Sequence, residues 1–229
     1  MTGSNLKEGR LRAGWTQKQA AKSLGLTQAY LSMIECGHRR VSPQVLLRAQ
    51  VFFDLPPTSL PLETAAPSST ESEALKLELG AFGYPGFGYL RGRPMRNPAE
   101  FLFAALDESD LDIRVVEALP WVAWRYAVDM NWDWLVRNTK TRNRQNRLGF
   151  VVSLAKEWAA KQEDHRRATK LAGPQAELEQ ALLAREDTLC HESMTNAERK
   201  WLQQNRPEQA KQWNLLTDIQ LDHLAYAAA

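Results

Sequence analysis

Two threonine–glutamine pairs, Thr16-Gln17 and Thr27-Gln28, are the residues whose types and spacing best suit contact with another molecule. A glutamine amide donates and accepts hydrogen bonds at once, which matches the N6 and N7 groups of adenine. Threonine favours the position just before a helix, so each glutamine should open a helix. Backbone N–H groups at such a helix start also attract phosphate. The pairs therefore predict base contact by Gln28 and phosphate contact by Gln17.

The residues around these pairs predict two short helices joined by a tight turn. Gly25 can adopt the left-handed conformation that ends the first helix, and Gly37 ends the second. Leu26 is apolar and can fill the gap between the two helices. Helical spacing places an apolar face on each helix, formed by Ala20, Ala21, Leu24, Leu31 and Ile34. Two short helices joined in this way form a helix-turn-helix.

The outward face of the second helix carries residues that a core does not need: Gln28, Ala29, Tyr30, Ser32 and Met33. Gln28 lies at the start, where a recognition helix meets base edges. Ala29 is small enough to lie against a thymine methyl group, and Tyr30 can reach a base or a phosphate. Arg39 and Arg40 follow the helix and can contact the DNA backbone. This helix is therefore predicted to read duplex DNA in the major groove.

The pattern resembles the phage lambda-type repressors, also called the XRE family, over about residues 5–58. The matching residues are Arg12, Gly14, Thr16, Gln17, Ala20, Ala21, Gly25, Gln28, Ile34, Glu35, Gly37 and Pro43. The resemblance implies a domain of five short helices that binds a palindromic operator as a homodimer. It also implies that Gln17 braces Gln28 and that Glu35 stabilises the fold. Cys36 departs from the family, which usually has asparagine or a similar polar residue there.

Charge and composition divide the chain into three parts. Residues 1–60 are expected to form the DNA-binding domain, since they hold eight Lys or Arg against three Asp or Glu, which favours a polyanionic partner. Residues 61–96 are interpreted as a linker and a loop rich in glycine, proline and aromatic residues. Residues 97–229 are expected to form a separate all-helical domain, with a last helix near residues 215–227. The predicted fold class is all-α.

The expected C-terminal domain holds seven of the eight tryptophans and a basic run, residues 137–147, with five Lys or Arg and no acid. Helical spacing would place Lys140, Arg144 and Arg147 on one face. A solvated helical face and a surface for an acidic partner, a nucleotide or additional DNA both remain open. The candidate partner or ligand residues are Trp132, Trp134, Arg137, Lys140, Arg144 and Arg147.

The segment from Trp132 to Phe150 is also similar to the tails of regulators encoded beside nucleotidyltransferase-like toxins. That similarity implies an antitoxin, which represses its own operon and neutralises a toxin protein through the C-terminal domain. Two alternatives remain open. One is a ligand-sensing repressor with an aromatic pocket in the C-terminal domain. The other is a non-enzymatic scaffold that uses its N-terminal domain for protein contacts.

Several function classes are disfavoured by what the sequence lacks. It has no P-loop, GxSxG, HExxH or CxxC motif, and its histidines are scattered, so neither catalysis nor a metal or cofactor is expected. Cys36 and Cys190 do not make a disulfide framework. No apolar run is long enough to cross a bilayer, and the N-terminus does not read as a secretory signal. A cytoplasmic protein is the expectation.

Overall fold

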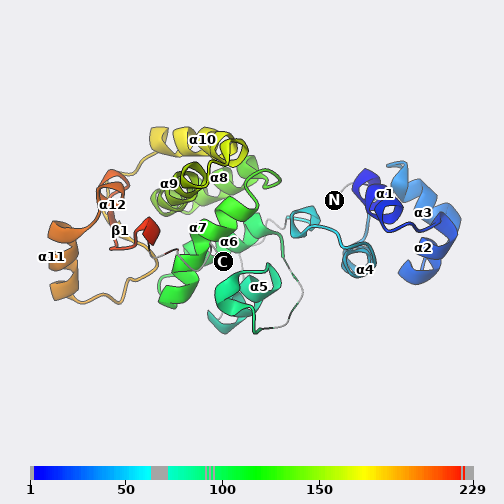
Figure 1. Ribbon diagram of the computed structural model, residues 1–229, viewed down its shortest axis with the longest axis horizontal. Coiled ribbons are helices and arrows are strands. Elements are labelled where there is room, and N and C mark those ends of the chain that lie inside the picture. The colour runs from blue at the N-terminus through cyan, green and yellow to red at the C-terminus, as the bar shows by residue number, and fades with distance from the viewer. Residues whose placement is uncertain are drawn as a thin grey trace. The chain divides into compact units, whose positions relative to one another are not determined.

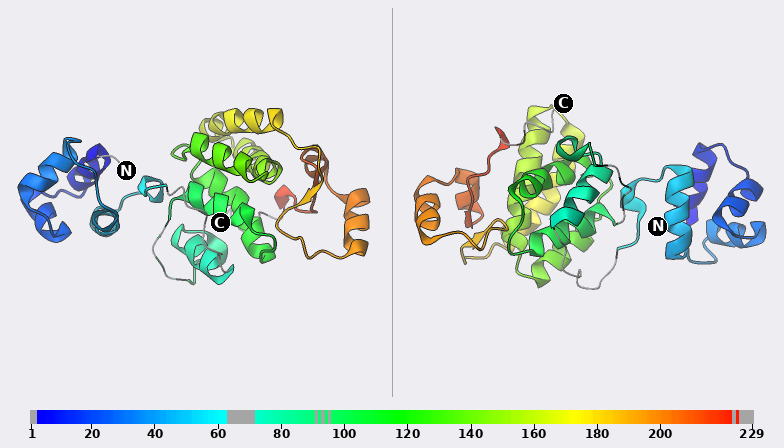
Figure 2. Two further views of the ribbon diagram at one scale, coloured as in Figure 1. Left: turned by 180° about the vertical axis from the view of Figure 1, so that it is seen from behind. Right: turned by 90° about the horizontal axis from the view of Figure 1, so that it is seen from below.

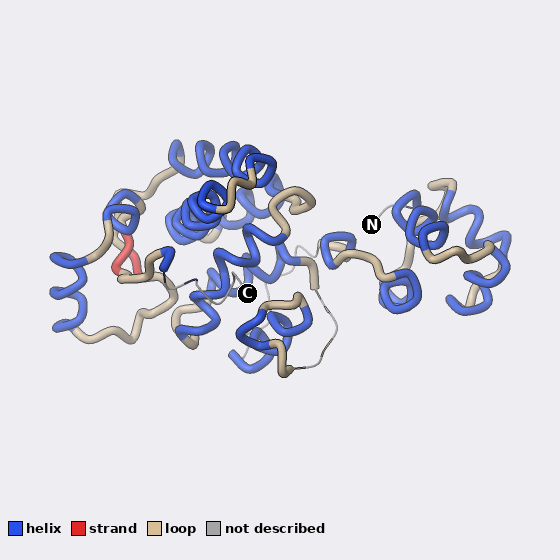
Figure 3. The backbone as a smooth tube through the Cα atoms, viewed as in Figure 1, coloured by secondary structure: helices blue, strands red, loops and turns tan. Residues whose placement is uncertain are grey.

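The computed structural model describes residues 3–62, 72–90, 92, 94, 96–222 and 224. In this part of the chain helices predominate, and the strands are one pair of two residues each (Figure 1, Figure 3). The predicted all-α class is therefore confirmed. The chain divides into two compact units, one formed by Met1–Glu63 with Met95–Asn97 and the other by Thr64–Pro94 with Pro98–Ala229. We call them the N-terminal and C-terminal units.

The N-terminal unit is a small bundle built around two linked helices. Its α-helices are α1 (Gly3–Arg12), α2 (Gln17–Leu24), α3 (Gln28–Glu35) and α4 (Pro43–Phe53). A 3₁₀ turn over Pro57–Ser59 follows. Residues 3–62 thus contain four α-helices and this turn, rather than the five helices that the resemblance implied. The core is formed by side chains from all four helices, among them Leu6, Ala20, Leu24, Leu31, Ile34, Val45, Ala49 and Phe53.

Local capping explains why α2 and α3 begin and end where they do. The Thr16 side chain accepts a hydrogen bond from the backbone N–H of Gln19, whose own side chain accepts from the Thr16 N–H. This reciprocal pair satisfies backbone donors that a helix start leaves open. Gly25 ends α2 at φ 72°, in the left-handed region that glycine adopts without strain. Thr27 then caps α3 by accepting from the Tyr30 N–H.

The C-terminal unit is a larger helical assembly (Figure 2). Its helix α9 (Gln145–Lys161) packs against α7 (Ile113–Arg125) and α10 (His165–Gln180), and most of its residues are buried. The remaining elements are α5 (Ser72–Ala81), a 3₁₀ turn (Pro85–Phe87), α6 (Pro98–Asp107), α8 (Trp132–Thr141), β1 (Asp187–Thr188), α11 (Asn196–Asn205), α12 (Glu208–Gln212) and β2 (Leu215–Leu216). None of the described helices combines the length and apolar character that a membrane span requires.

Two segments differ from the sequence-based expectation. The range 61–96, interpreted as linker and loop, contains α5, whose Leu75 and Leu79 are fully buried. Residues 215–222 do not form the predicted last helix. Instead, β2 pairs in parallel with β1, so that Asp187 lies opposite Leu215. Residues 223 and 225–227 of that predicted helix lie outside the described residues.

Candidate nucleic-acid interface

Helix α3 presents one face to the core and the opposite face to solvent. Leu31 and Ile34 are fully buried. The residues predicted to read bases are exposed or, for Ser32, half-buried: Gln28, Ala29, Tyr30, Ser32 and Met33. Tyr30 and Met33 keep 37% and 38% of their surface accessible, so both side chains can be contacted from outside the unit. The unit thus offers the face that the sequence predicted for base contact.

The starts of α2 and α3 keep free backbone donors. Thr16 and Thr27 accept from the third N–H of each helix, at 3.3 Å and 3.2 Å. The first two N–H groups of a helix have no intrahelical acceptor, so those of Gln17 and Gln28 stay available. Such donors, together with the helix dipole, attract phosphate. Both predicted contact positions therefore combine a glutamine amide with an open N–H group.

The side chain of Gln17 is oriented by Glu35. The resemblance had implied that Gln17 braces Gln28, but the structure shows no hydrogen bond between these two described residues. Gln17 Nε2 donates to Glu35 Oε2 at 2.9 Å. The Gln28 amide makes no hydrogen bond with any residue that the structure describes. Gln28 is therefore free to meet a base edge, and Gln17 is held at the surface of α2 by a residue at the end of α3.

Glu35 also joins α1 to α3 through a buried ion pair. Arg10 Nε and Nη2 donate to the Glu35 carboxylate at 2.6 Å and 3.0 Å, and Arg10 Nη1 donates to the Trp15 carbonyl at 2.8 Å. Burial raises the pKa of Glu35, but the hydrogen bonds from Arg10 and Gln17 outweigh it and hold that pKa below 4.5. This geometry supports the structural role predicted for Glu35. Its partner Arg10 was not foreseen, because the two residues are far apart in sequence.

Arg39 and Arg40 are exposed in the segment that follows α3. Neither makes an ion pair with a described residue, so both guanidinium groups are free to contact phosphate. Arg48 is used differently, since its Nη1 donates to the Leu24 carbonyl at 3.0 Å and so satisfies the end of α2. Two free cations therefore lie just beyond the predicted recognition helix, where they can contact the DNA backbone.

The basic run of residues 137–147 does not form one helical face. Lys140 lies in α8, Arg144 in the turn after it and Arg147 in α9. Arg147 is fully buried and bound to Asp187 and Glu192, so it cannot meet a partner or ligand as predicted. The prediction of a shared surface for these residues was wrong because the chain reverses between them.

The other candidates from that region have internal contacts as well. Lys140 pairs with Glu177 at 2.6 Å, and Arg144 lies 3.5 Å from a carboxylate oxygen of Asp107. Two half-buried tryptophans complete the set. Trp132 donates to the Ala127 carbonyl at 2.8 Å, and Trp134 packs edge-on against Phe103 at 5.7 Å between ring centres. Arg137 alone among the six is exposed without a described partner.

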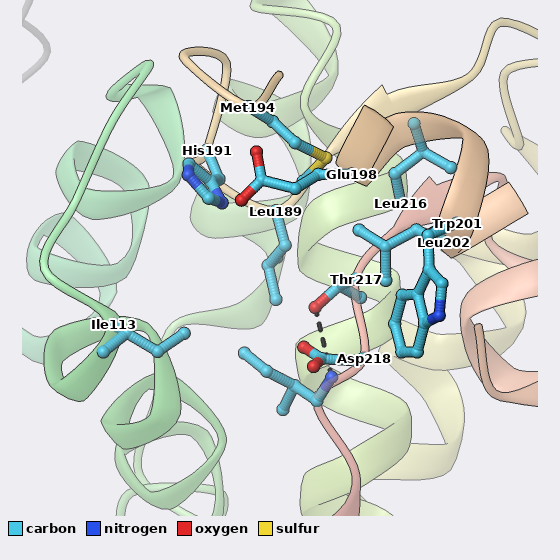
Figure 4. A pocket seen from close by; sticks show the side chains of 11 residues that line it. Ile113, Leu189, His191, Met194, Glu198, Trp201, Leu202, Leu216, Thr217 and Asp218 are labelled. Carbon is cyan, nitrogen blue, oxygen red and sulfur yellow. Dashed lines mark hydrogen bonds between the residues drawn. The ribbon is translucent and has the colours of Figure 1, made fainter. Parts of the chain in front are cut away.

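The C-terminal unit also contains a pocket of about 190 Å³, which we call the Trp201 pocket (Figure 4). Its apolar lining includes Ile113, Leu189, Met194, Trp201, Leu202 and Leu216. These residues come from the start of α7, the segment after β1, α11 and β2. Sequence reasoning anticipated an aromatic pocket but not this one, because its lining is assembled from segments distant in the chain.

Comparison with known proteins agrees with the geometry of the N-terminal unit. A family model described as helix-turn-helix matches residues 6–60, which begin within α1 and extend past α4. No curated protein and no solved structure matches the chain. The family match covers the residues that position α3 and does not extend into the C-terminal unit.

Proposed function

We infer that this chain, a DNA-binding transcription regulator whose residues 6–60 form an XRE-type helix-turn-helix domain, binds a palindromic operator as a homodimer and represses its own transcription. The observation that carries the inference is the exposed face of α3, which begins with the free Gln28 amide, together with the capped starts of α2 and α3. One short helix reads too few base pairs for useful specificity. Two copies on half-sites about 34 Å apart would solve this.

In this proposal five residues of the N-terminal unit each have one task. The Gln28 amide pairs with the N6 and N7 groups of an adenine, and Ala29 lies against a thymine methyl group. The open N–H of Gln17 meets a phosphate beside the same groove. Arg39 and Arg40 neutralise phosphates further along, which adds affinity without sequence preference.

Replacing Gln28 with alanine is expected to weaken operator binding by about 1–3 kcal/mol, since it removes a paired contact to one base. Fluorescence anisotropy with labelled DNA from upstream of the coding sequence, at one fixed salt concentration, measures this loss. Gln204→Ala is the matched control, because Gln204 is an exposed glutamine of α11 in the C-terminal unit. Equal affinity of the Gln28→Ala variant and the native protein would contradict the assignment and favour a protein-binding scaffold.

An apolar stripe on α4 supports pairing of two copies. Leu47 and Val51 are 50% and 43% exposed. They are four positions apart and so lie on one face of the helix. Exposed apolar residues that adjoin on one face often mark protein contacts. Because α3 carries the proposed base-reading residues, α4 is available for contact with the second copy.

Changing Leu47 and Val51 together to glutamate is expected to give a monomer that binds the full operator much more weakly, because four carboxylates would face one another across the interface. Sedimentation velocity gives the oligomeric state and anisotropy the affinity. The control is Leu77→Glu with Leu182→Glu, two exposed leucines of the C-terminal unit. A dimer that survives the α4 changes, or dissociates only with the control pair, would place the interface elsewhere.

A second candidate function is control of this regulator by a small effector, and the Trp201 pocket is the observation that favours it. The antitoxin role finds less support. The basic residues proposed for its partner include Arg147, which is buried, and Lys140, which pairs with Glu177. Co-purification of a protein encoded beside this gene would favour the antitoxin. Release of the operator by a small molecule would favour the effector.

A further inference from the structure

We propose that the Trp201 pocket binds a small amphipathic cation, namely an amine attached to an apolar or aromatic body. The inference concerns the C-terminal unit alone and depends on the lining of that pocket. It goes beyond the proposed DNA binding and would stand if the operator contacts were assigned differently.

The walls of the pocket are apolar and partly open to solvent. Leu189, Leu202 and Leu216 are buried at its base. Ile113 and Trp201 are 56% and 55% exposed, although both are large apolar residues. The volume of about 190 Å³ is smaller than that of sites for drug-sized ligands, so the pocket suits a small ligand of few atoms. The apolar body of a ligand would cover surface that is now in water.

The charged groups in the lining are predominantly acidic. They are the carboxylates of Glu198 and Asp218, and the lining residues include no Lys or Arg. Glu198 is held in place, because one of its oxygens accepts from the N–H and the hydroxyl of Thr195, both at 2.7 Å. Asp218 makes no hydrogen bond or ion pair with a described residue. A carboxylate without a partner beside an apolar wall attracts a cation and repels an anion.

The aromatic ring adds a second preference for positive charge. Figure 4 shows Asp218 and the Trp201 ring in one part of the pocket, with His191 and Glu198 toward another. The face of an indole attracts an ammonium group through its quadrupole. The amine group of the ligand would therefore lie between the Asp218 carboxylate and the Trp201 ring. The apolar part of the ligand would contact Leu189. Fatty acids, nucleotides and other anions would meet two like charges.

The test compares tryptamine with indole-3-propionate, which share an indole body and carry opposite charges. Isothermal titration calorimetry on the full-length chain should show tryptamine binding at least about tenfold more tightly. Tryptamine should also raise the midpoint of thermal unfolding of the C-terminal unit. Equal affinities, tighter binding of the propionate, or binding of neither probe would overturn the proposal.

Variants assign the binding to this pocket. Asp218→Asn should remove most of the preference for the amine, and Trp201→Ala should weaken both probes. Asp222→Asn is the matched control, because Asp222 is an almost fully exposed aspartate whose described contact is Lys161 at 3.6 Å. Gln28→Ala should bind tryptamine as the native chain does, which separates this inference from the operator contacts. Unchanged tryptamine affinity in Asp218→Asn and Trp201→Ala, with circular dichroism showing a native fold, would overturn the proposal.

Discussion

Replacing Arg147 with alanine is expected to destabilise the C-terminal unit by about 3–5 kcal/mol, the range found when one partner of a buried ion pair is removed. The Arg147 side chain is fully buried. Its loss would leave the carboxylates of Asp187 and Glu192 with only the more distant cation of Arg144, at 3.6 Å and 3.7 Å, and would also open a cavity beneath them. Both effects act in the same direction, so the substitution should be among the most damaging in this unit.

The reason for so large an effect is that Arg147 uses all five of its N–H donors. Nε and Nη2 donate to the two oxygens of Asp187, each at 2.9 Å, and Nη2 also donates to Glu192 at 3.1 Å. Nη1 donates to the carbonyls of Leu106 and Glu108 at 3.0 Å and 2.7 Å. The guanidinium thereby fastens α9 to the end of α6 and to β1. Lysine has three donors at a single point and could not replace this fork.

Urea unfolding followed by tryptophan fluorescence measures the loss, since seven of the eight tryptophans are in the C-terminal unit. Arg142→Ala is the control from the same basic run. Its side chain is 43% exposed and lies 3.9 Å from Asp107, so its removal should cost well under about 1 kcal/mol. Arg147→Lys should fall between the two. If Arg147→Ala and Arg142→Ala had the same midpoint, the buried network would not be a main source of stability.

Arg147 also shows where sequence reasoning reaches its limit. Caps are local, so Thr16, Thr27 and Gly25 could be placed from neighbouring residues, and the exposed face of α3 followed from its period. Burial of Arg147 depends on Asp187 and Glu192, some forty residues further along the chain. A basic run without acidic residues nearby in the sequence predicts an exposed surface. Only the folded structure shows that Asp187 and Glu192 pair with Arg147.

Other parts of the C-terminal unit were hidden for the same reason. Gly149 lies within α9, where a glycine usually weakens a helix. A Cβ atom there would lie 2.1 Å from the ring of Trp213, so the glycine admits a ring that arrives from the segment after α12. The parallel strand pair and the Trp201 pocket also join distant segments. Helix α5 was missed for a local reason. Leu75 and Leu79 have helical spacing, but the glycines and prolines around them favoured the interpretation of this range as linker and loop.

The Arg10–Glu35 pair connects stability to DNA binding in the N-terminal unit, because three helices meet at one carboxylate. Arg10 belongs to α1, Gln17 to α2 and Glu35 to α3. Glu35→Ala would leave the Arg10 guanidinium buried without its counter-ion and release the Gln17 side chain. We expect a loss of about 3–5 kcal/mol in the unfolding free energy of this unit. Operator affinity should also fall, since the hydrogen bond that positions Gln17 of α2 against the end of α3 would be lost.

Glu35→Gln keeps the size of the side chain and an oxygen acceptor, so it should fold and show a smaller loss of stability. It also tests the charge through pH. The native pKa of Glu35 lies below its ordinary value of 4.5, so the ionised form stabilises the fold above that value. This contribution is lost as pH falls through the lower native pKa, and Glu35→Gln should remove that part of the acid dependence. Glu8→Gln is the control, because Glu8 is an exposed glutamate of α1. Equal acid unfolding of Glu35→Gln and the native chain would show that the ion pair does not hold the three helices together, and the positioning of Gln17 would then need another cause.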